Sequence, residues 1–186
     1  IYWIHLSDLI SGYELPETPG RTYFRNASEV RRAGFELSGV LQISDFLKTK
    51  FQYEYAHFFF KNYFLGNNNL SGNLQPIIPK HKIVLFLDGR VKDYVNGNLH
   101  FGYQSSMFLD DLNLVKSEPL YTLHLSLNSG NRISKIFTFG IVWNNIFNIN
   151  AFSNFRANAS FSRYDEAASP SGVSFIFRYN LTYPTK

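Results

Sequence analysis

Residues Val173–Tyr183, which read VSFIFRYNLTY, alternate along their length between two kinds of side chain. Successive side chains of a strand point to opposite faces, so every second residue shares a face. One face is wholly apolar and aromatic, whereas the other is mostly polar and includes Arg178 and Asn180. About eleven residues with this pattern match a strand that crosses a bilayer. A strand of a soluble sandwich gives the same alternation, so the rest of the chain must discriminate between the two folds.

The composition favours the membrane. Aromatic residues are frequent, since 19 Phe, 12 Tyr and 2 Trp make up 18% of the 186 residues. Rings of this kind form the two interfacial girdles of a transmembrane barrel. The mean hydropathy of -0.18 resembles that of a soluble protein, but a barrel gives similar values because every second residue faces its lumen. No apolar run approaches the roughly 18 residues of a transmembrane helix, so a membrane-embedded chain would span as strands.

Charge and cysteine content narrow the function classes. The formal net charge of +4 is spread without a Lys/Arg block, so nucleic acid is not an expected partner. The absence of Cys excludes disulfides and Cys-based metal sites. The sequence starts at Ile1, inside an apparent strand and without a signal peptide, which leads us to expect a portion of something larger.

About eight up-and-down strands are predicted, joined by loops that alternate between short and long. The expected strands are 1–14, 27–43, 47–60, 81–92, 98–109, 120–128, 135–147 and 173–183. The expected short turns are Ser44–Phe46, Asp93–Gly97 and Ser129–Arg132, and the long segments surround Pro16, Asn68, Asp111 and Phe155. Short turns at one end and long loops at the other are typical of outer-membrane barrels. We therefore predict an all-β, antiparallel transmembrane β-barrel.

The alternation also predicts which side chains point outward and which point inward, because a one-residue slip would reverse a whole strand. The outward set is Phe51, Tyr53, Leu85, Phe101, Tyr103, Leu123, Leu125, Phe139, Phe175 and Phe177. The inward set is Glu36, Glu54, Asp88, Arg90, His100, His124 and Arg178.

Four stretches, in order along the chain, carry a resemblance to one family. The first is YFRNA at residues 23–27 followed by RAGFE at 32–36, and the second is Gly72-Asn73 with Pro76 and Pro79-Lys80-His81. The third is FGI at 139–141 with NIFN at 145–148, and the fourth is RAN at 156–158 with Arg163-Tyr164 and Glu166-Ala167. Together these stretches resemble the C-terminal barrel half of TonB-dependent outer-membrane receptors.

The resemblance implies that residues 1–186 are the C-terminal part of a barrel of about 22 strands, without the plug domain. It implies a receptor in a Gram-negative outer membrane that takes up a scarce nutrient, such as a ferric siderophore or cobalamin, with energy from TonB. The implied partners are lipid, the remaining strands and plug, the TonB complex indirectly, and a small-molecule metal chelate. No cofactor and no catalysis are expected. The first and last strands should pair with strands outside this sequence rather than with each other, because open edges are not tolerated in hydrocarbon.

Two alternatives to a receptor remain open from the residues. One is an independent eight-stranded barrel with a structural or adhesive role. The other is a barrel-embedded lipase, because counting from the expected turns places Asp88, His100 and Ser126 in one inward row. A lumenal polar network is the preferred interpretation of that row.

A metal site is not expected. Counting places His100 and His124 about four residues apart in register, or about 13 Å, which is too far for one ion. Asp110, Asp111 and Asn113 are expected to form a solvated turn rather than a calcium site, since the EF-hand spacing is missing.

Substrate contacts are expected in the long outer segments, where charged and aromatic groups could meet an anionic chelate. The candidates are Arg156, Arg163 and Tyr164. The terminal strand that would close the barrel is expected to present Phe175, Phe177, Tyr179 and Tyr183 to lipid.

Overall fold

The computed structural model describes residues 1–14, 21–150, 152–156 and 164–179. Within these residues the secondary structure consists of strands, and no helix has the length and apolarity needed to span a membrane. The strands are β1 (Tyr2–Glu14), β2 (Thr22–Ser44), β3 (Leu47–Leu65), β4 (Asn68–Asn69), β5 (His81–Val91), β6 (Val95–Gln104), β7 (Leu120–Ser129), β8 (Phe137–Asn144), β9 (Phe152–Arg156), β10 (Tyr164–Ala167) and β11 (Gly172–Tyr179).

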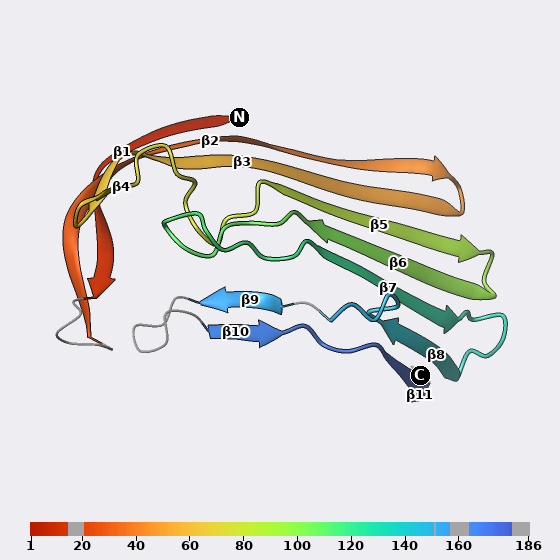
Figure 1. Ribbon diagram of the computed structural model, residues 1–186. Coiled ribbons are helices and arrows are strands. Elements are labelled where there is room, and N and C mark those ends of the chain that lie inside the picture. The colour runs from red at the N-terminus through yellow and green to blue at the C-terminus, as the bar shows by residue number, and fades with distance from the viewer. Residues whose placement is uncertain (15–20, 151, 157–163, 180–186) are drawn as a thin grey trace, which may run out of the picture.

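Eight strands form one antiparallel sheet in the order β1-β2-β3-β5-β6-β7-β8-β11 (Figure 1). The short strand β4 pairs with the end of β3, and β9 and β10 form a separate two-stranded ribbon. All pairings between strands are antiparallel and nearly all join neighbours in sequence, as the alternating pattern requires. The predicted all-β, up-and-down fold is therefore confirmed.

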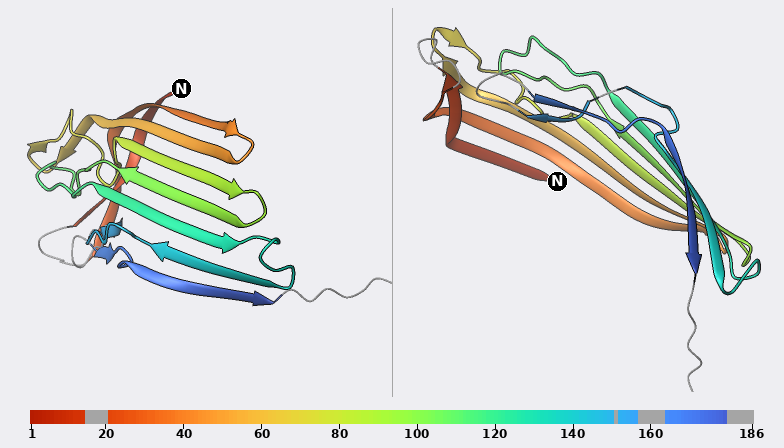
Figure 2. Two further views of the ribbon diagram at one scale, coloured as in Figure 1. Left: turned by 90° about the vertical axis from the view of Figure 1, so that its right-hand side faces the viewer. Right: turned by 90° about the horizontal axis from the view of Figure 1, so that it is seen from below.

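The main sheet is a single curved layer that remains open within the described residues (Figure 2). Strand β1 pairs with β2 and strand β11 pairs with β8, and these two outer strands do not pair with each other. The expectation that the first and last strands do not close a small barrel together is thus confirmed for the described residues.

The loops sort by end, as predicted. The three tight connections lie together at the right of Figure 1, where backbone hydrogen bonds join them. Arg90 N donates to Phe46 O at 2.8 Å, and Arg132 N donates to Asp93 O at 2.9 Å. The segments around Asn68, Asp111 and Phe155 lie at the opposite end, and Pro16 is outside the described residues. We call these the turn end and the loop end.

The register places the two predicted sets of side chains on opposite faces. Tyr53, Ile83, Tyr103 and Tyr121 are consecutive cross-strand partners on one face. The residues one position along, Gln52, Val84, Gly102 and Thr122, are partners on the other. The same alternation holds across β8 and β11, where Phe139 pairs with Phe177 and Thr138 with Arg178. The face with Tyr53 is called the apolar face, and the face with Glu54 the polar face.

Buried side chains gather at the loop end instead of in the middle of the sheet. Val30, Phe60, Tyr63 and Leu70 form the buried cluster, with Leu6, Leu9 and Leu65 packed against it. Elsewhere the apolar face carries large exposed side chains, such as Phe175 at 82% and Phe177 at 64%. A soluble sandwich needs a second layer over such a face, and the described residues provide none. This observation rejects the sandwich.

Two hairpin registers differ from the prediction by two residues, since Asp88 pairs with Asn98 rather than His100, and His100 pairs with His124 rather than Ser126. The turn between β5 and β6 is Lys92–Tyr94, with Val91 paired to Val95, and not Asp93–Gly97. Lys92 has a positive φ of 48°, and Tyr94 N donates to the Val91 carbonyl at 3.0 Å, which closes the turn. The shorter turn shifts every partner in β6, with consequences for the site.

Candidate functional site

Charged side chains meet across neighbouring strands on the polar face. Lys50 Nζ on β3 lies 3.4 Å from Asp88 Oδ2 on β5, and Asn98 on β6 donates to the other oxygen of that carboxylate. Nearer the loop end, Lys82 Nζ lies 3.7 Å from Glu54 Oε2. These pairs are partly exposed and contribute little stability. Their effect is to keep this face polar along the length of the strands.

Three rings form a row across the middle of the polar face. Phe86, His100 and His124 are consecutive cross-strand partners, with ring centroids 4.4 Å and 5.4 Å apart and nearly parallel planes. The expected separation of four residues between the two histidines was therefore wrong, because the hairpin turns are placed differently. His124 Nδ1 also lies 3.3 Å from Asn144 Oδ1. Within the described residues, no group of three or more His, Asp or Glu side chains is placed to hold a metal ion.

The same register separates the three residues of the hydrolytic alternative. Asp88 and Ser126 both pair with Asn98, while His100 lies in the next row between Phe86 and His124. The predicted Asp88, His100 and Ser126 row was wrong by two residues. No described contact joins the three side chains, so the structure gives the lipase no support.

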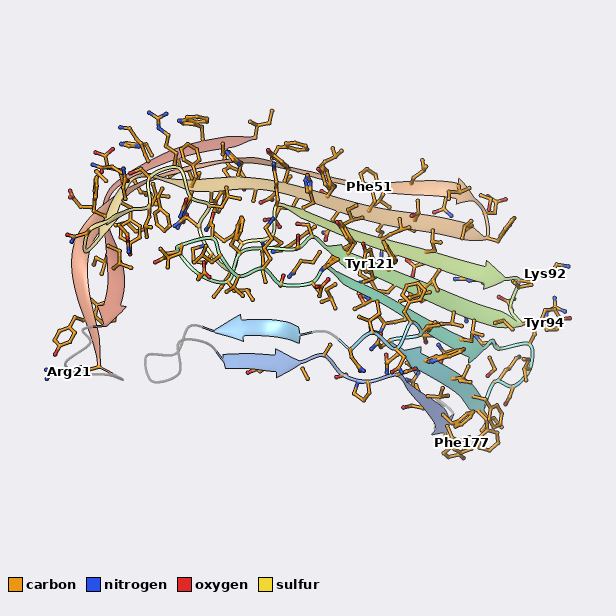
Figure 3. The ribbon with its side chains drawn as sticks, viewed as in Figure 1. Arg21, Phe51, Lys92, Tyr94, Tyr121 and Phe177 are labelled. Carbon is orange, nitrogen blue, oxygen red and sulfur yellow. The ribbon has the colours of Figure 1, made fainter. Side chains whose placement is uncertain are left out.

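A shallow polar depression lies on the sheet at the turn end. It has a volume of about 480 Å³ and is lined by Lys48, Asp88, Arg90, Asn96, Asn98 and Asn128, among others. Neither Lys48 nor Arg90 takes part in an ion pair within the described residues. The depression can therefore accept carboxylate or amide groups from whatever faces it. Lys92, Tyr94 and Phe177 lie at this end of the sheet and Arg21 at the opposite end (Figure 3).

The Arg32 guanidinium group lies at the loop end of the polar face and contacts two side chains from other segments. Arg32 Nε donates to Gln75 Oε1 at 2.8 Å, and Arg32 Cζ lies 5.3 Å from the Phe58 ring. The Tyr2 ring packs edge-on against Phe58 at 6.1 Å. Tyr2 also lies across Gly34, where a side chain would collide with the Tyr2 ring and with the Tyr55 carbonyl. Glycine is therefore required for this close approach of β1 to β2.

Hydrogen bonds fix the long connections above the sheet. Tyr63 O–H donates to Asp111 Oδ2 at 3.3 Å, and Asn73 Nδ2 donates to the Asp111 carbonyl at 2.8 Å. Asn113 brackets Leu74, accepting from its N–H at 2.8 Å and donating to its carbonyl at 2.9 Å. Asp111 and Asn113 are half-buried. The expectation of a merely solvated turn was wrong, because these side chains join the two longest described loops.

Burial raises the pKa of the Asp111 carboxyl above its ordinary value. The Tyr63 hydrogen bond opposes this rise, and the nearby Asp110 charge adds to it. Asp110 itself accepts from the N–H groups of Leu114 and Val115, both at 2.9 Å. The loop end thus contains a carboxyl group that resists ionisation.

Two of the three predicted substrate contacts lie in the β9–β10 ribbon. Arg156 on β9 pairs directly with Tyr164 on β10, so the backbone brings these two candidates together at the loop end (Figure 1). Arg163 lies outside the described residues. These three assignments stay predictions.

The terminal strand has the predicted apolar face. Phe177 lies 5.3 Å from both Phe137 and Phe139, and Tyr179 lies 5.3 Å from Phe137, all measured between ring centroids. Phe175, nearer the middle of β11, is largely exposed, and Tyr183 is outside the described residues. The rings form an aromatic cluster at the turn end of the apolar face.

Sequence reasoning missed Arg32, Gln75 and Tyr63 as organising residues. Arg32 and Gln75 are 43 positions apart, and Tyr63 and Asp111 are 48 apart. The alternation of side chains within a strand does not predict contacts between residues so far apart in sequence. The one indication in the sequence is that Arg32 lies in one of the family-like stretches and Gln75 lies within another.

A one-layer antiparallel sheet with an uncovered apolar face, a polar opposite face and loops sorted by length is a segment of a transmembrane β-barrel. The family model described as "TonB dependent receptor-like, beta-barrel" matches residues 1–146. The chain therefore belongs to the TonB-dependent receptor family and contributes to its barrel. Receptors of this family are transporters of the Gram-negative outer membrane rather than enzymes.

Solved structures agree with this fold. The ferric yersiniabactin uptake receptor FyuA from Yersinia pestis is similar with a TM-score of 0.73 and 16% identity, covering 97% of this chain and 26% of that chain. The siderophore receptor PiuA from Acinetobacter baumannii has a TM-score of 0.69 and 18% identity, with 87% and 23% covered. The ferripyoverdine receptor of Pseudomonas aeruginosa has a TM-score of 0.66 and 11% identity, with 95% and 24% covered.

The chain thus spans about a quarter of the length of these receptors. A comparison with curated protein sequences found no match.

Proposed function

We propose that this chain is part of a receptor that carries a scarce nutrient, such as a ferric siderophore, across the outer membrane with energy from TonB. The supporting observation is the likeness of the whole sheet to receptors whose names specify ferric yersiniabactin and ferripyoverdine. The barrel would not act chemically. It would satisfy every backbone hydrogen bond against lipid and enclose the transport path.

The polar face would line the lumen and contact a plug domain. Its loop half offers Arg32, Glu36, Glu54 and Lys82, and its turn half offers the depression with Lys48 and Arg90. Both signs of charge are present, so a complementary polar domain could be held without an apolar interface. The remaining barrel strands would pair with the outer edges of β1 and β11, because unpaired N–H and C=O groups are costly in hydrocarbon.

The substrate would be captured at the loop end. Arg156, Arg163 and Tyr164 could give charge-assisted and aromatic contacts to an anionic metal chelate. The paired positions of Arg156 and Tyr164 support a joint role for those two.

Uptake of labelled ferric chelates tests the function. The intact receptor would be expressed in a receptor-deficient Gram-negative strain, with and without TonB, and offered a panel of hydroxamate, catecholate and carboxylate chelates. Uptake of at least one chelate that requires both the receptor and TonB is expected. Uptake of every chelate at the same rate with and without the receptor would contradict the proposal.

The substrate residues need a separate comparison. Arg163→Ala should weaken chelate binding at unchanged surface expression. The matched variant Lys92→Ala, at the turn end of the sheet, should leave it unchanged. Equal binding by both variants would remove Arg163 from the site while leaving the transport function intact.

A further inference from the structure

The apolar face ends in a belt of aromatic rings near the loop end. Phe35 contacts Tyr53 and Tyr55 at 5.5 Å and 5.7 Å, and His81 stacks on Tyr53 at 6.1 Å, measured between centroids. Tyr53 and His81 are also joined by a 2.9 Å hydrogen bond. The belt continues across the sheet through a further ring pair, Tyr103 and Tyr121, 5.0 Å apart. Amphipathic rings in this arrangement mark the level at which hydrocarbon gives way to lipid headgroups.

Two rows of the same face lie beyond the belt, and each includes at least one basic side chain. In the first row Trp3 pairs with Ala33, which pairs with His57. In the second row His5 pairs with Arg31, which pairs with Phe59. Direct partners have Cβ atoms about 4.5 to 5.5 Å apart, so the Arg31 guanidinium and the His5 imidazole can reach one ligand together.

A lysine lies between the belt and these rows. Lys80 Nζ is 5.7 Å from the centroid of Tyr55, and the Lys80 carbonyl accepts from Ala56 N at 3.0 Å, which fixes the lysine beside β3. The lysine is exposed. Its ammonium lies near the Tyr55 ring of the belt, and Tyr55 shares the apolar face with Arg31.

The charges of this patch are only partly offset by a neighbouring carboxylate. Glu29 is bound to Lys61 at 2.8 Å, and its charge also acts on His5 and Arg31 from a longer range. Arg31, Lys80 and His5 form no ion pair within the described residues. The Nδ1 atom of His57 is shielded from solvent and lacks a hydrogen-bond partner among the described residues. Basic groups at headgroup level attract anionic headgroups, and a guanidinium group can bind a phosphate through two parallel hydrogen bonds.

We propose that His5, Arg31, His57 and Lys80 form a binding site for the phosphate group of an outer-leaflet lipid. The long loops face outward in barrels of this kind, so the loop end of the apolar face meets the outer leaflet. The lipid chains would lie along the apolar face below the belt, with Trp3, which is 67% exposed, beside the headgroup. This site faces away from the lumen and is independent of the nutrient that the receptor carries.

Lipid retention by the intact receptor tests the site. The purified receptor would be placed in nanodiscs of phosphatidylcholine containing lipid A, either with its phosphates or enzymatically dephosphorylated, and the bound lipid counted by native mass spectrometry. Arg31→Gln should lower the affinity for the phosphorylated lipid about fivefold, and Arg31→Gln with Lys80→Gln about thirtyfold, since each cation contributes about 1 kcal/mol near a charged headgroup. The charge-matched control Lys92→Gln, at the turn end, should change nothing.

Three results would overturn the proposal. The first is unchanged retention of the phosphorylated lipid in the double variant while its circular dichroism remains that of a folded sheet. The second is an equal loss of the phosphorylated and dephosphorylated lipids, which would mean that the residues act through packing alone. The third is binding of inorganic phosphate as tight as that of the lipid, which would assign the site to a free anion. Chelate uptake, measured in parallel, would separate a failure of this site from a failure of the transport function.

Discussion

The apolar and polar faces of the sheet are made by the same strands, yet they need different surroundings. On the apolar face, no second layer from the part of the chain that the structure describes covers rows such as Leu99, Leu125 and Trp143. On the polar face, one residue along, Asn98 and Ser126 are partners near a bound carboxylate. The difference shows how a sequence whose mean hydropathy resembles that of a soluble protein specifies a membrane strand. Each strand presents apolar side chains to lipid on one face and polar side chains on the other.

The largest expected contrast is at two neighbouring residues of β7. Leu125 lies midway between the belt residue Tyr121 and the level of Phe139 at the turn end, close to the bilayer midplane. Leu125→Arg should cost about 2 to 4 kcal/mol of folding free energy in lipid. Ser126→Arg, on the polar face, should cost much less. Urea titrations of the intact receptor in lipid vesicles would measure both, and equal losses would contradict the assignment of faces.

A second contrast concerns two glycines of β2 on opposite faces. A side chain at Gly34 would collide with the Tyr55 carbonyl as well as the Tyr2 ring, whereas one at Gly39 would meet only the Phe51 ring. Backbone cannot yield as a ring can, so Gly34→Ala should cost about 1 to 3 kcal/mol and Gly39→Ala less. The same titration checks the order, and a larger loss at Gly39 would show that the Phe51 ring is held rigidly.

A smaller difference is expected between the neighbours Tyr53 and Glu54. Tyr53→Phe removes the hydrogen bond to His81 within the belt and should cost about 1 kcal/mol. Glu54→Gln breaks a partly exposed ion pair to Lys82 and should cost about 0.2 to 1 kcal/mol. Raising the salt concentration should reduce the second effect and leave the first unchanged, which distinguishes the two in a salt series.

The faces could be predicted from the sequence because alternation is local, and an error of two residues leaves it unchanged. For this reason the alternation predicts the correct face for Asp88 and His100, although the partners predicted for them are wrong. Register depends on the turn, and nothing in the letters around Lys92 specifies that three residues close the hairpin with a positive φ at the first. Which side chains are neighbours across the strands depends on the register, and these contacts could therefore not be predicted.

The loop end could be predicted least. Its contacts join residues far apart in sequence, such as Arg32 with Gln75 and Tyr63 with Asp111. The β9–β10 ribbon was likewise missed, because its strands are short and carry no sustained alternation. The pairing of Arg156 with Tyr164 was found only from the backbone.

The smallest predicted effect is a pH dependence at the loop end, where loops cover the polar face. The Asp111 pKa is raised in the folded protein above the ordinary value of 3.8, so the folded loops bind a proton more readily than the unfolded chain. Between the ordinary and the raised pKa the unfolded state loses its proton first. The contribution of Asp111 to loop stability therefore falls as the pH rises through that window and grows again on acidification.

Asp111→Asn keeps an acceptor for the Tyr63 hydroxyl but cannot ionise, so this pH dependence of loop stability should disappear. Hydrogen exchange of the loop amides between pH 4 and pH 7, corrected for intrinsic rates, would follow both proteins. Glu118→Gln, an exposed change in the same connection, provides the control. A parallel response in the Asp111→Asn protein would place the titrating group elsewhere.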